Sequence, residues 1–109
     1  SAFTDKGIDG LAKSYKELKK THPKEINEGL LNNLGYRLLR EKKLQDAIQI
    51  FTLNVEIHPD YANGYDSLGE AYMANGENEL AIKNYKKSLA LDPQNDNAVQ
   101  KLKKLEEKN

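Results

Sequence analysis

The most restrictive feature of the sequence is an internal repeat with a period of 34 residues. Five positions carry the same residue in both copies, and a sixth carries phenylalanine in one copy and tyrosine in the other. All of them fall in one register without a gap. The matched pairs are Leu34 and Leu68, Gly35 and Gly69, Ala47 and Ala81, Ile48 and Ile82, Phe51 and Tyr85, and Pro59 and Pro93. Self-similarity at this spacing predicts stacked supersecondary units that share one continuous core.

Each copy has the pattern of two helices joined by a short turn. In the second copy, an apolar stripe at helical spacing runs from Tyr65 to Tyr72, and another runs from Ala81 to Leu89. Gly76 lies in the break between the stripes, and Pro93 follows the second one. Proline disfavours helical backbone at the residue before it, so the chain turns there into the next unit. The two copies are therefore predicted to be antiparallel helix pairs at 28–61 and 62–95.

This pattern resembles the tetratricopeptide repeat (TPR) family. The resemblance rests on an aromatic residue, Leu-Gly and Tyr in the first helix, on Ala-x-x-x-aromatic in the second, and on the closing proline. The first copy departs from the pattern where Leu31 replaces the aromatic residue and Leu38 the tyrosine, but both positions stay apolar. The resemblance implies an all-α fold, a right-handed α-solenoid of antiparallel helix pairs. It also implies a scaffold for protein–protein interaction, whose first helices line a concave groove.

The segments outside the two copies predict one further helix at each end. Residues 5–22 resemble the second helix of a degenerate repeat, with Tyr15 in the place of Phe51. Residues 96–107 place apolar residues on one face and Lys and Glu on the other, which suits a terminal capping helix. The expected architecture is a single domain over 1–109 with about six helices: a half-repeat, two full repeats and a cap.

Several interior residues predict specific packing. Glycine in a helix costs about 1 kcal/mol relative to alanine, so we expect a neighbouring helix to approach Gly35 and Gly69 closely, with Phe51 and Tyr85 filling the space. A buried, unpaired amide would cost about 1–3 kcal/mol, so Asn54 should be hydrogen-bonded or tilted toward solvent. The first helix of the first copy should turn four leucines inward: Leu30, Leu31, Leu34 and Leu38.

Composition and motifs argue against catalysis and against nucleic-acid or membrane partners. The 17 basic residues balance 17 acidic ones, and only Arg37 and Arg40 supply guanidinium groups for phosphate or base contacts. No apolar run reaches the length of a membrane span. His22 and His58 each precede a proline at equivalent junctions, so they should not converge on one metal ion. Because no nucleophile elbow or glycine-rich phosphate loop occurs either, we expect no enzyme activity and no cofactor.

The expected functional surface is the concave face of the first helices. By repeat register, the positions that point away from the second helices carry amide, aromatic, apolar and charged groups, a mixture that suits an extended protein or peptide segment. The candidates are Asn32, Tyr36, Leu39, Arg40, Asn63, Asp66, Glu70, Met73, Asn97, Gln100 and Lys101. The alternative is that these residues pack on the N-terminal helix or on a parent domain.

Members of this family are known to grip the acidic C-terminal carboxylate of heat-shock chaperones in a clamp of lysine, asparagine and arginine. By repeat position, the residues that this sequence supplies for the clamp are Asn32, Tyr36, Ser67, Asn97 and Lys101. Only Lys101 keeps the positive charge, and Asp66 beside it would repel a carboxylate. We therefore expect the clamp not to form.

Residues 31–91 also resemble the C-terminal repeat extension of bacterial serine hydrolases of the β-lactamase-like or esterase type. That resemblance implies a catalytic serine in a preceding domain, and a module that contacts the hydrolase or forms a homodimer instead of binding a free ligand. The chain begins with Ser-Ala and not with Met, as a fragment would. A fragment of an exported hydrolase would be periplasmic or secreted, whereas a complete chain would be cytoplasmic.

Overall fold

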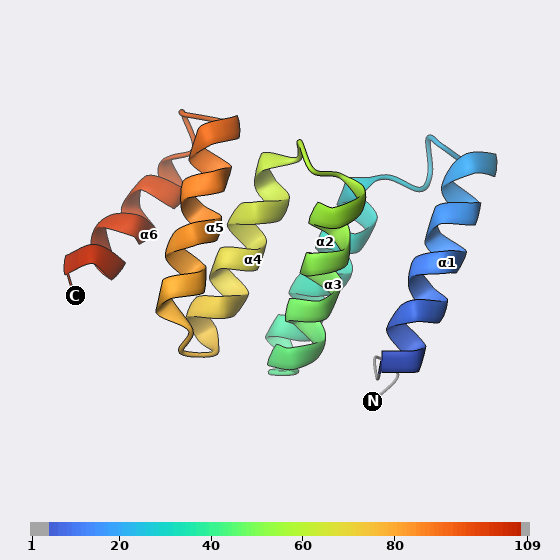
Figure 1. Cartoon of the computed structure of the whole chain (residues 1–109), viewed down its shortest axis with the longest axis horizontal. Coiled ribbons are helices and arrows are strands. Elements are labelled where there is room, and N and C mark those ends of the chain that lie inside the picture. Colours follow the sequence, from blue (N-terminus) through green and yellow to red (C-terminus); the bar gives the residue numbers. More distant parts are fainter. Residues whose placement is uncertain (1–4, 108–109) are drawn as a thin grey trace.

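The computed structural model describes residues 5–107, with side chains from residue 10 onward, and this range contains six α-helices and no strand (Figure 1). The helices follow the predicted segments: α1 (Asp5–Thr21), α2 (Glu28–Arg40), α3 (Leu44–Ile57), α4 (Ala62–Ala74), α5 (Asn78–Leu91) and α6 (Asp96–Glu107). The all-α solenoid is therefore confirmed. None of these helices is both long and apolar enough to cross a membrane.

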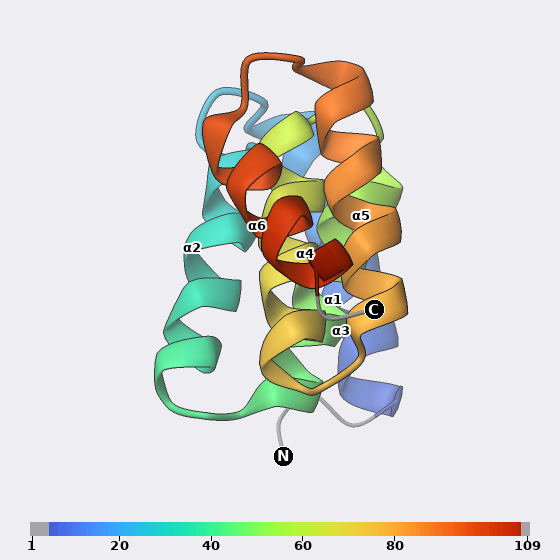
Figure 2. The ribbon, with the colours of Figure 1, turned by 90° about the vertical axis from the view of Figure 1, so that its left-hand side faces the viewer.

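The helices form two layers in an elongated molecule of 44 × 29 × 18 Å. Seen from the α6 end, α2 and α6 lie on one side and α1, α3 and α5 on the other (Figure 2). Helix α4 belongs to the layer of α2 and α6, because its side chains hydrogen-bond to both. The first helices of the repeats thus form one face of the molecule, as the repeat register predicts.

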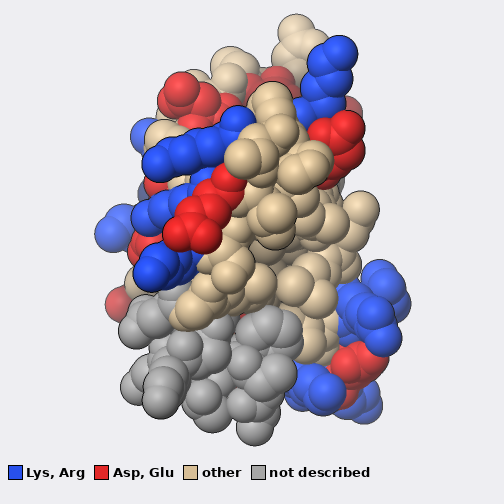
Figure 3. All heavy atoms as spheres, turned by 90° about the vertical axis from the view of Figure 1, so that its right-hand side faces the viewer, with Lys and Arg blue, Asp and Glu red and all other residues tan. Residues whose placement is uncertain are grey.

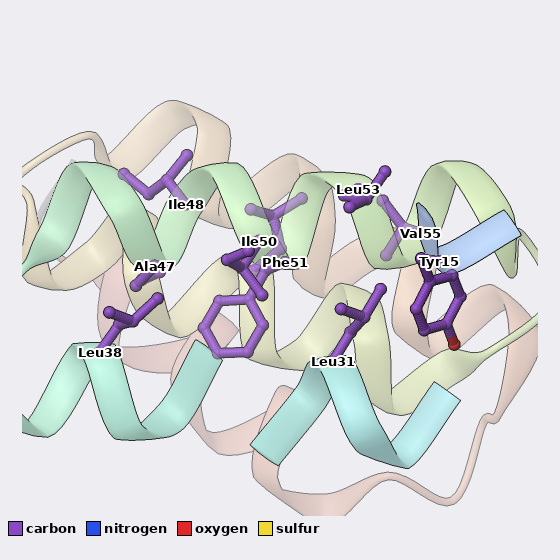
Figure 4. Packing of buried hydrophobic residues seen from close by; sticks show 11 residues of the cluster. Tyr15, Leu31, Leu38, Ala47, Ile48, Ile50, Phe51, Leu53 and Val55 are labelled. Carbon is purple, nitrogen blue, oxygen red and sulfur yellow. The ribbon is translucent and has the colours of Figure 1, made fainter. Parts of the chain in front are cut away.

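Each repeat is held together by an aromatic side chain that lies against a helical glycine. Phe51 of α3 points at α2 between Leu31 and Leu38 (Figure 4), and a Cβ added to Gly35 would lie 2.6 Å from Cδ1 and Cζ of its ring. In the second repeat, a Cβ on Gly69 would lie 3.1 Å from three atoms of the Tyr85 ring. These equivalent contacts explain why two good helices each keep a glycine at their centre.

A second equivalent pair ties the start of each first helix to the end of its partner. The Asn54 side chain donates from Nδ2 to the carbonyl of Glu28 at 3.0 Å, and the Ser88 hydroxyl donates to the carbonyl of Ala62 at 2.8 Å. Asn54 and Ser88 are fully buried. The prediction for Asn54 is thus confirmed in its hydrogen-bonded form, although Oδ1 of the same amide has no hydrogen-bond partner.

The turns and helix starts repeat as well. The turn between the helices of each pair needs one residue with positive φ, which is Lys42 (φ 60°) in the first repeat and Gly76 (φ 79°) in the second. Glycine adopts this conformation at no steric cost, whereas lysine rarely does. Asn27 caps α2 by accepting from the backbone N–H of Gly29, and Asn95 accepts from the N–H of Ala98 in the first turn of α6.

The N-terminal helix departs from the expected repeat geometry. Helix α1 packs mainly against α3, and only Tyr15 among its described side chains is buried. Leu30 on α2 is consequently 47% exposed, so the prediction that all four leucines of this helix point inward is wrong for this one. The reason is that no preceding second helix lies over that part of α2. Leu18 of α1 is exposed to a similar degree, 46%.

Candidate functional site

The layer formed by α2, α4 and α6 carries a row of polar side chains that connects the three helices. We call this row the inner wall. Its members are Asn32, Tyr36, Asp66, Ser67, Glu70, Asn97 and Lys101. All of them come from first helices of the repeats or from the cap, because the repeat register turns these positions away from α3 and α5.

Helices α2 and α4 are joined at Ser67, which is buried between them. Its hydroxyl donates to Oδ1 of Asn32 at 2.6 Å and lies 3.2 Å from the hydroxyl of Tyr36. Glu70, one turn further along α4, is close enough to influence the Tyr36 hydroxyl electrostatically. The Tyr36 ring packs edge-on against Phe51, with 5.3 Å between centroids. Burial, more than any other factor, raises the pKa of Tyr36, so this phenol stays protonated and acts as a donor.

Helices α4 and α6 are joined through the carboxylate of Asp66. The Asn97 amide donates to both of its oxygens, at 2.9 and 3.1 Å. Burial raises the pKa of Asp66, and the nearby Glu70 raises it further, whereas hydrogen bonds from Asn97 and Asn95 and the charge of Lys101 lower it. The carboxylate is therefore fixed in orientation but only partly compensated in charge.

The structure brings six of the predicted groove residues together in the inner wall and leaves the others apart. The six are Asn32, Tyr36, Asp66, Glu70, Asn97 and Lys101. Leu39 packs on the core cluster around α3, as Tyr36 does, whereas Met73 packs on the cluster of α5 and α6. Arg40, Asn63 and Gln100 are exposed at other points of α2, α4 and α6.

Ser67 was expected only as a clamp position, and Asn95 was not among the predicted groove residues. Ser67 links α2 to α4, and Asn95, like Asn97, opposes the rise in the pKa of Asp66 that burial causes. The sequence signal that could have identified Ser67 is a polar residue at a helical position that the repeat buries. Among the residues that the structure describes, no group of three or more His, Cys, Asp and Glu side chains could hold a metal ion.

A separate polar cluster docks α1 on the junction after α3. The Tyr15 hydroxyl donates to the carbonyl of Asn27 at 2.8 Å and lies 3.0 Å from Nε2 of His58. Because that hydroxyl donates its only proton to the Asn27 carbonyl, Nε2 of His58 must be protonated and donate to the hydroxyl oxygen. Nδ1 of the neutral ring is then unprotonated and lies 3.5 Å from Nζ of Lys19. Burial lowers the pKa of His58, Lys19 lowers it further, and Glu28 opposes both.

Acidification should loosen α1. The pKa of His58 is lower in the folded chain than in the unfolded one. The contribution of neutral His58 to folding stability is therefore fully present above about pH 6.5 and is lost as the pH falls below that value. Protonated Nδ1 would face the Lys19 ammonium. Hydrogen exchange, corrected for intrinsic rates, should show that the α1 amides are less protected at pH 5.5 than at pH 7.5. Lys19→Gln should reduce this difference, and equal protection at both pH values would contradict the docking role of His58.

Comparison with known proteins agrees with this geometry. Residues 69–102 match the family model described as TPR repeat. The chain is 37% identical over 70 residues to the Hsp70-Hsp90 organizing protein of Triticum aestivum, covering 64% of this chain and 12% of that protein. It is 34% identical over 99 residues to the heat shock protein STI1 of Saccharomyces cerevisiae, covering 87% of this chain and 16% of that protein.

A solved structure covers nearly the whole chain. The first TPR of Spaghetti (RPAP3), bound to the HSP90 peptide SRMEEVD, superimposes with a TM-score of 0.72 at 27% identity, covering 97% of this chain and 82% of that one. The chain is therefore a helical-repeat solenoid, a stack of helix pairs in which the first helices of the repeats and the cap form one polar face. Together with the matched family model, they show that the chain belongs to the tetratricopeptide repeat family. The chain spans only 12% and 16% of the two curated relatives.

Proposed function

We propose that the chain is a protein–protein interaction module that holds an extended peptide segment of a partner along the inner wall, and that it acts by binding and not by catalysis. The observation that supports this most is the alignment of hydrogen-bonding side chains from three successive first helices on one face. Amide, hydroxyl and carboxylate groups in a row can bind the backbone of an extended chain. The RPAP3 domain, which has the same fold, is bound to a peptide.

The partner should differ from the acidic peptide in the RPAP3 complex. The wall presents Asp66 and Glu70 where an acidic ligand would lie, and Lys101 alone opposes them within the wall. Asn32 and Asn97 supply amides and no positive charge. A ligand ending in several carboxylates would therefore meet net repulsion.

If the peptide binds along the inner wall, the amide of Asn32 should contribute to affinity, whereas the amide of the adjacent, exposed Asn33 should not. A random dodecapeptide display library is selected on the purified chain, and an enriched peptide is synthesised and titrated by fluorescence anisotropy. Asn32→Ala should weaken binding by about tenfold, as expected for the loss of a hydrogen-bonding group at an interface. Asn33→Ala removes the same amide from the next, exposed position and should bind like the wild type. If both variants bind equally well, the ligand does not use the inner wall.

A structural role is the second candidate, and the N-terminal end of the solenoid favours it. Leu18 and Leu30 are both nearly half exposed, and a band of uncharged atoms crosses this end between charged residues (Figure 3). A second copy of the chain, or a preceding hydrolase domain as the sequence resemblance implies, would bury such a surface. In light scattering, a tight dimer that no longer binds the selected peptide would favour this role over peptide binding.

A further inference from the structure

We propose that the inner wall selects a basic peptide, whose lysine or arginine side chain is held between the carboxylates of Asp66 and Glu70. This specificity presupposes the proposed peptide-binding function and adds the class of side chain that the wall recognises. Three features of the structure lead to it: the placement of the two carboxylates, the cost of keeping one of them ionised, and a buried hydroxyl without a partner.

The two carboxylates lie one turn apart on α4, in the middle of the wall and half buried. Asn97 of α6 orients Asp66 by donating to both of its oxygens, and Glu70 lies near the Tyr36 hydroxyl of α2. Lys101 is the cation that acts on Asp66. Two acids against one base leave this part of the wall with one formal negative charge, already in position for a cation.

Ionised Asp66 lowers the stability of the folded chain. Its pKa is raised mainly by burial and additionally by Glu70, so at neutral pH the charged form is less favourable in the folded chain than in the unfolded one. A carboxylate that is oriented by amides yet insufficiently compensated is typical of a binding site. A ligand cation between Asp66 and Glu70 would supply the missing charge.

The third feature is Tyr85 of α5, whose ring lies against Gly69 of α4 and whose hydroxyl is close enough to Asp66 and Glu70 to be influenced by their charges. Its side chain is fully buried and its hydroxyl has no hydrogen-bond partner. Packing alone does not require this hydroxyl, because Phe51 fills the equivalent place against Gly35. Burial raises the pKa of Tyr85, and the charges of Asp66 and Glu70 raise it further, so the phenol stays protonated as a donor next to the two carboxylates. An unpaired buried hydroxyl is costly.

An extended basic peptide satisfies all three features at once. Its ammonium or guanidinium group would pair with Asp66 and Glu70, and the carbonyl oxygen of its backbone would accept from the Tyr85 hydroxyl after a small side-chain movement in the wall. Charge-assisted hydrogen bonds of this kind are among the strong ones in proteins. Lys101 competes for Asp66, and its removal should therefore strengthen the binding of a basic ligand.

The test uses the peptide-display selection on the whole chain. Enriched peptides should carry an excess of Lys and Arg over the unselected library, and the acidic peptide SRMEEVD should bind at least about tenfold more weakly than an enriched one. The double variant Asp66→Asn/Glu70→Gln should bind an enriched peptide about tenfold or more weakly than the wild type does. Lys101→Gln should bind the same peptide more tightly. The melting temperature of the double variant should be unchanged or higher, because the costly carboxylate is gone.

Two control variants separate the proposal from a general charge effect. Glu56→Gln with Glu79→Gln removes two exposed carboxylates elsewhere and should leave the affinity unchanged. Tyr85→Phe should weaken binding without loss of stability, since the first repeat has phenylalanine at this place. Enriched peptides without excess basic residues, or unaltered affinity in the Asp66→Asn/Glu70→Gln variant, would overturn the proposed specificity alone. Absence of any enriched peptide would overturn peptide binding itself, and the specificity with it.

Discussion

Replacing Gly35 with alanine should lower the free energy of unfolding by about 1–3 kcal/mol, the usual range for overpacking a core. The new Cβ would lie 2.6 Å from ring atoms of Phe51, a fully buried side chain packed between Leu31 and Leu38. Because the ring is fully buried, it cannot make room by turning toward solvent. Alanine normally stabilises a helix by about 1 kcal/mol relative to glycine, so the steric cost must exceed this gain. Urea unfolding followed by circular dichroism measures the difference.

Two other glycines serve as controls for the same substitution. At Gly69 the Tyr85 ring atoms lie at 3.1 Å, so a shift of a few tenths of an ångström accommodates the Cβ, and Gly69→Ala should destabilise less than Gly35→Ala. A Cβ on Gly10 meets nothing within 4 Å, and Gly10→Ala should not destabilise at all. If Gly35→Ala were as stable as wild type, the close approach of Phe51 would not be the reason for the glycine.

The repeat made most of the fold predictable because identical residues face identical contacts. The spacing of 34 residues places Gly35 against Phe51 and Gly69 against Tyr85 in the same way. A stripe of leucines, however, indicates only that a helix has an apolar side, and not which element covers that side. Whether Leu30 is covered depends on the position of α1, and α1 packs on α3 through Tyr15, a placement that no local pattern encodes.

The candidate site was predictable as a face and not as a set of contacts. Helical register identifies the side chains that point away from the second helices, and six of the predicted ones meet in the inner wall. Which of them hydrogen-bond depends on side-chain length and on the rotation between neighbouring helices. The register therefore gave no indication that Ser67 joins Asn32 to Tyr36, or that the Tyr85 hydroxyl is buried without a partner.

Replacing Tyr15 with alanine should release α1 from the rest of the solenoid. Tyr15 is 4% exposed and is the buried anchor of this helix, and its hydroxyl bonds both the carbonyl of Asn27 and the ring of His58. Deleting a buried aromatic side chain costs about 3–5 kcal/mol, and the other apolar side chains of α1 that pack on the core, Leu11 and Ala12, are only partly buried. Hydrogen exchange should then show loss of protection over Asp5–Thr21, while α4 and α5 keep theirs.

The conservative variant distinguishes the ring from its hydroxyl. Tyr15→Phe keeps the packing on α3 and removes only the hydrogen bonds, so it should cost about 1 kcal/mol and leave α1 docked. Because burial and Lys19, and not the Tyr15 hydroxyl, lower the pKa of His58, the protection of α1 in this variant should depend on pH as it does in the wild type. If Tyr15→Ala instead reduced protection equally in all six helices, α1 would belong to the same cooperative unit as the repeats, and its docking would be a condition for forming the inner wall.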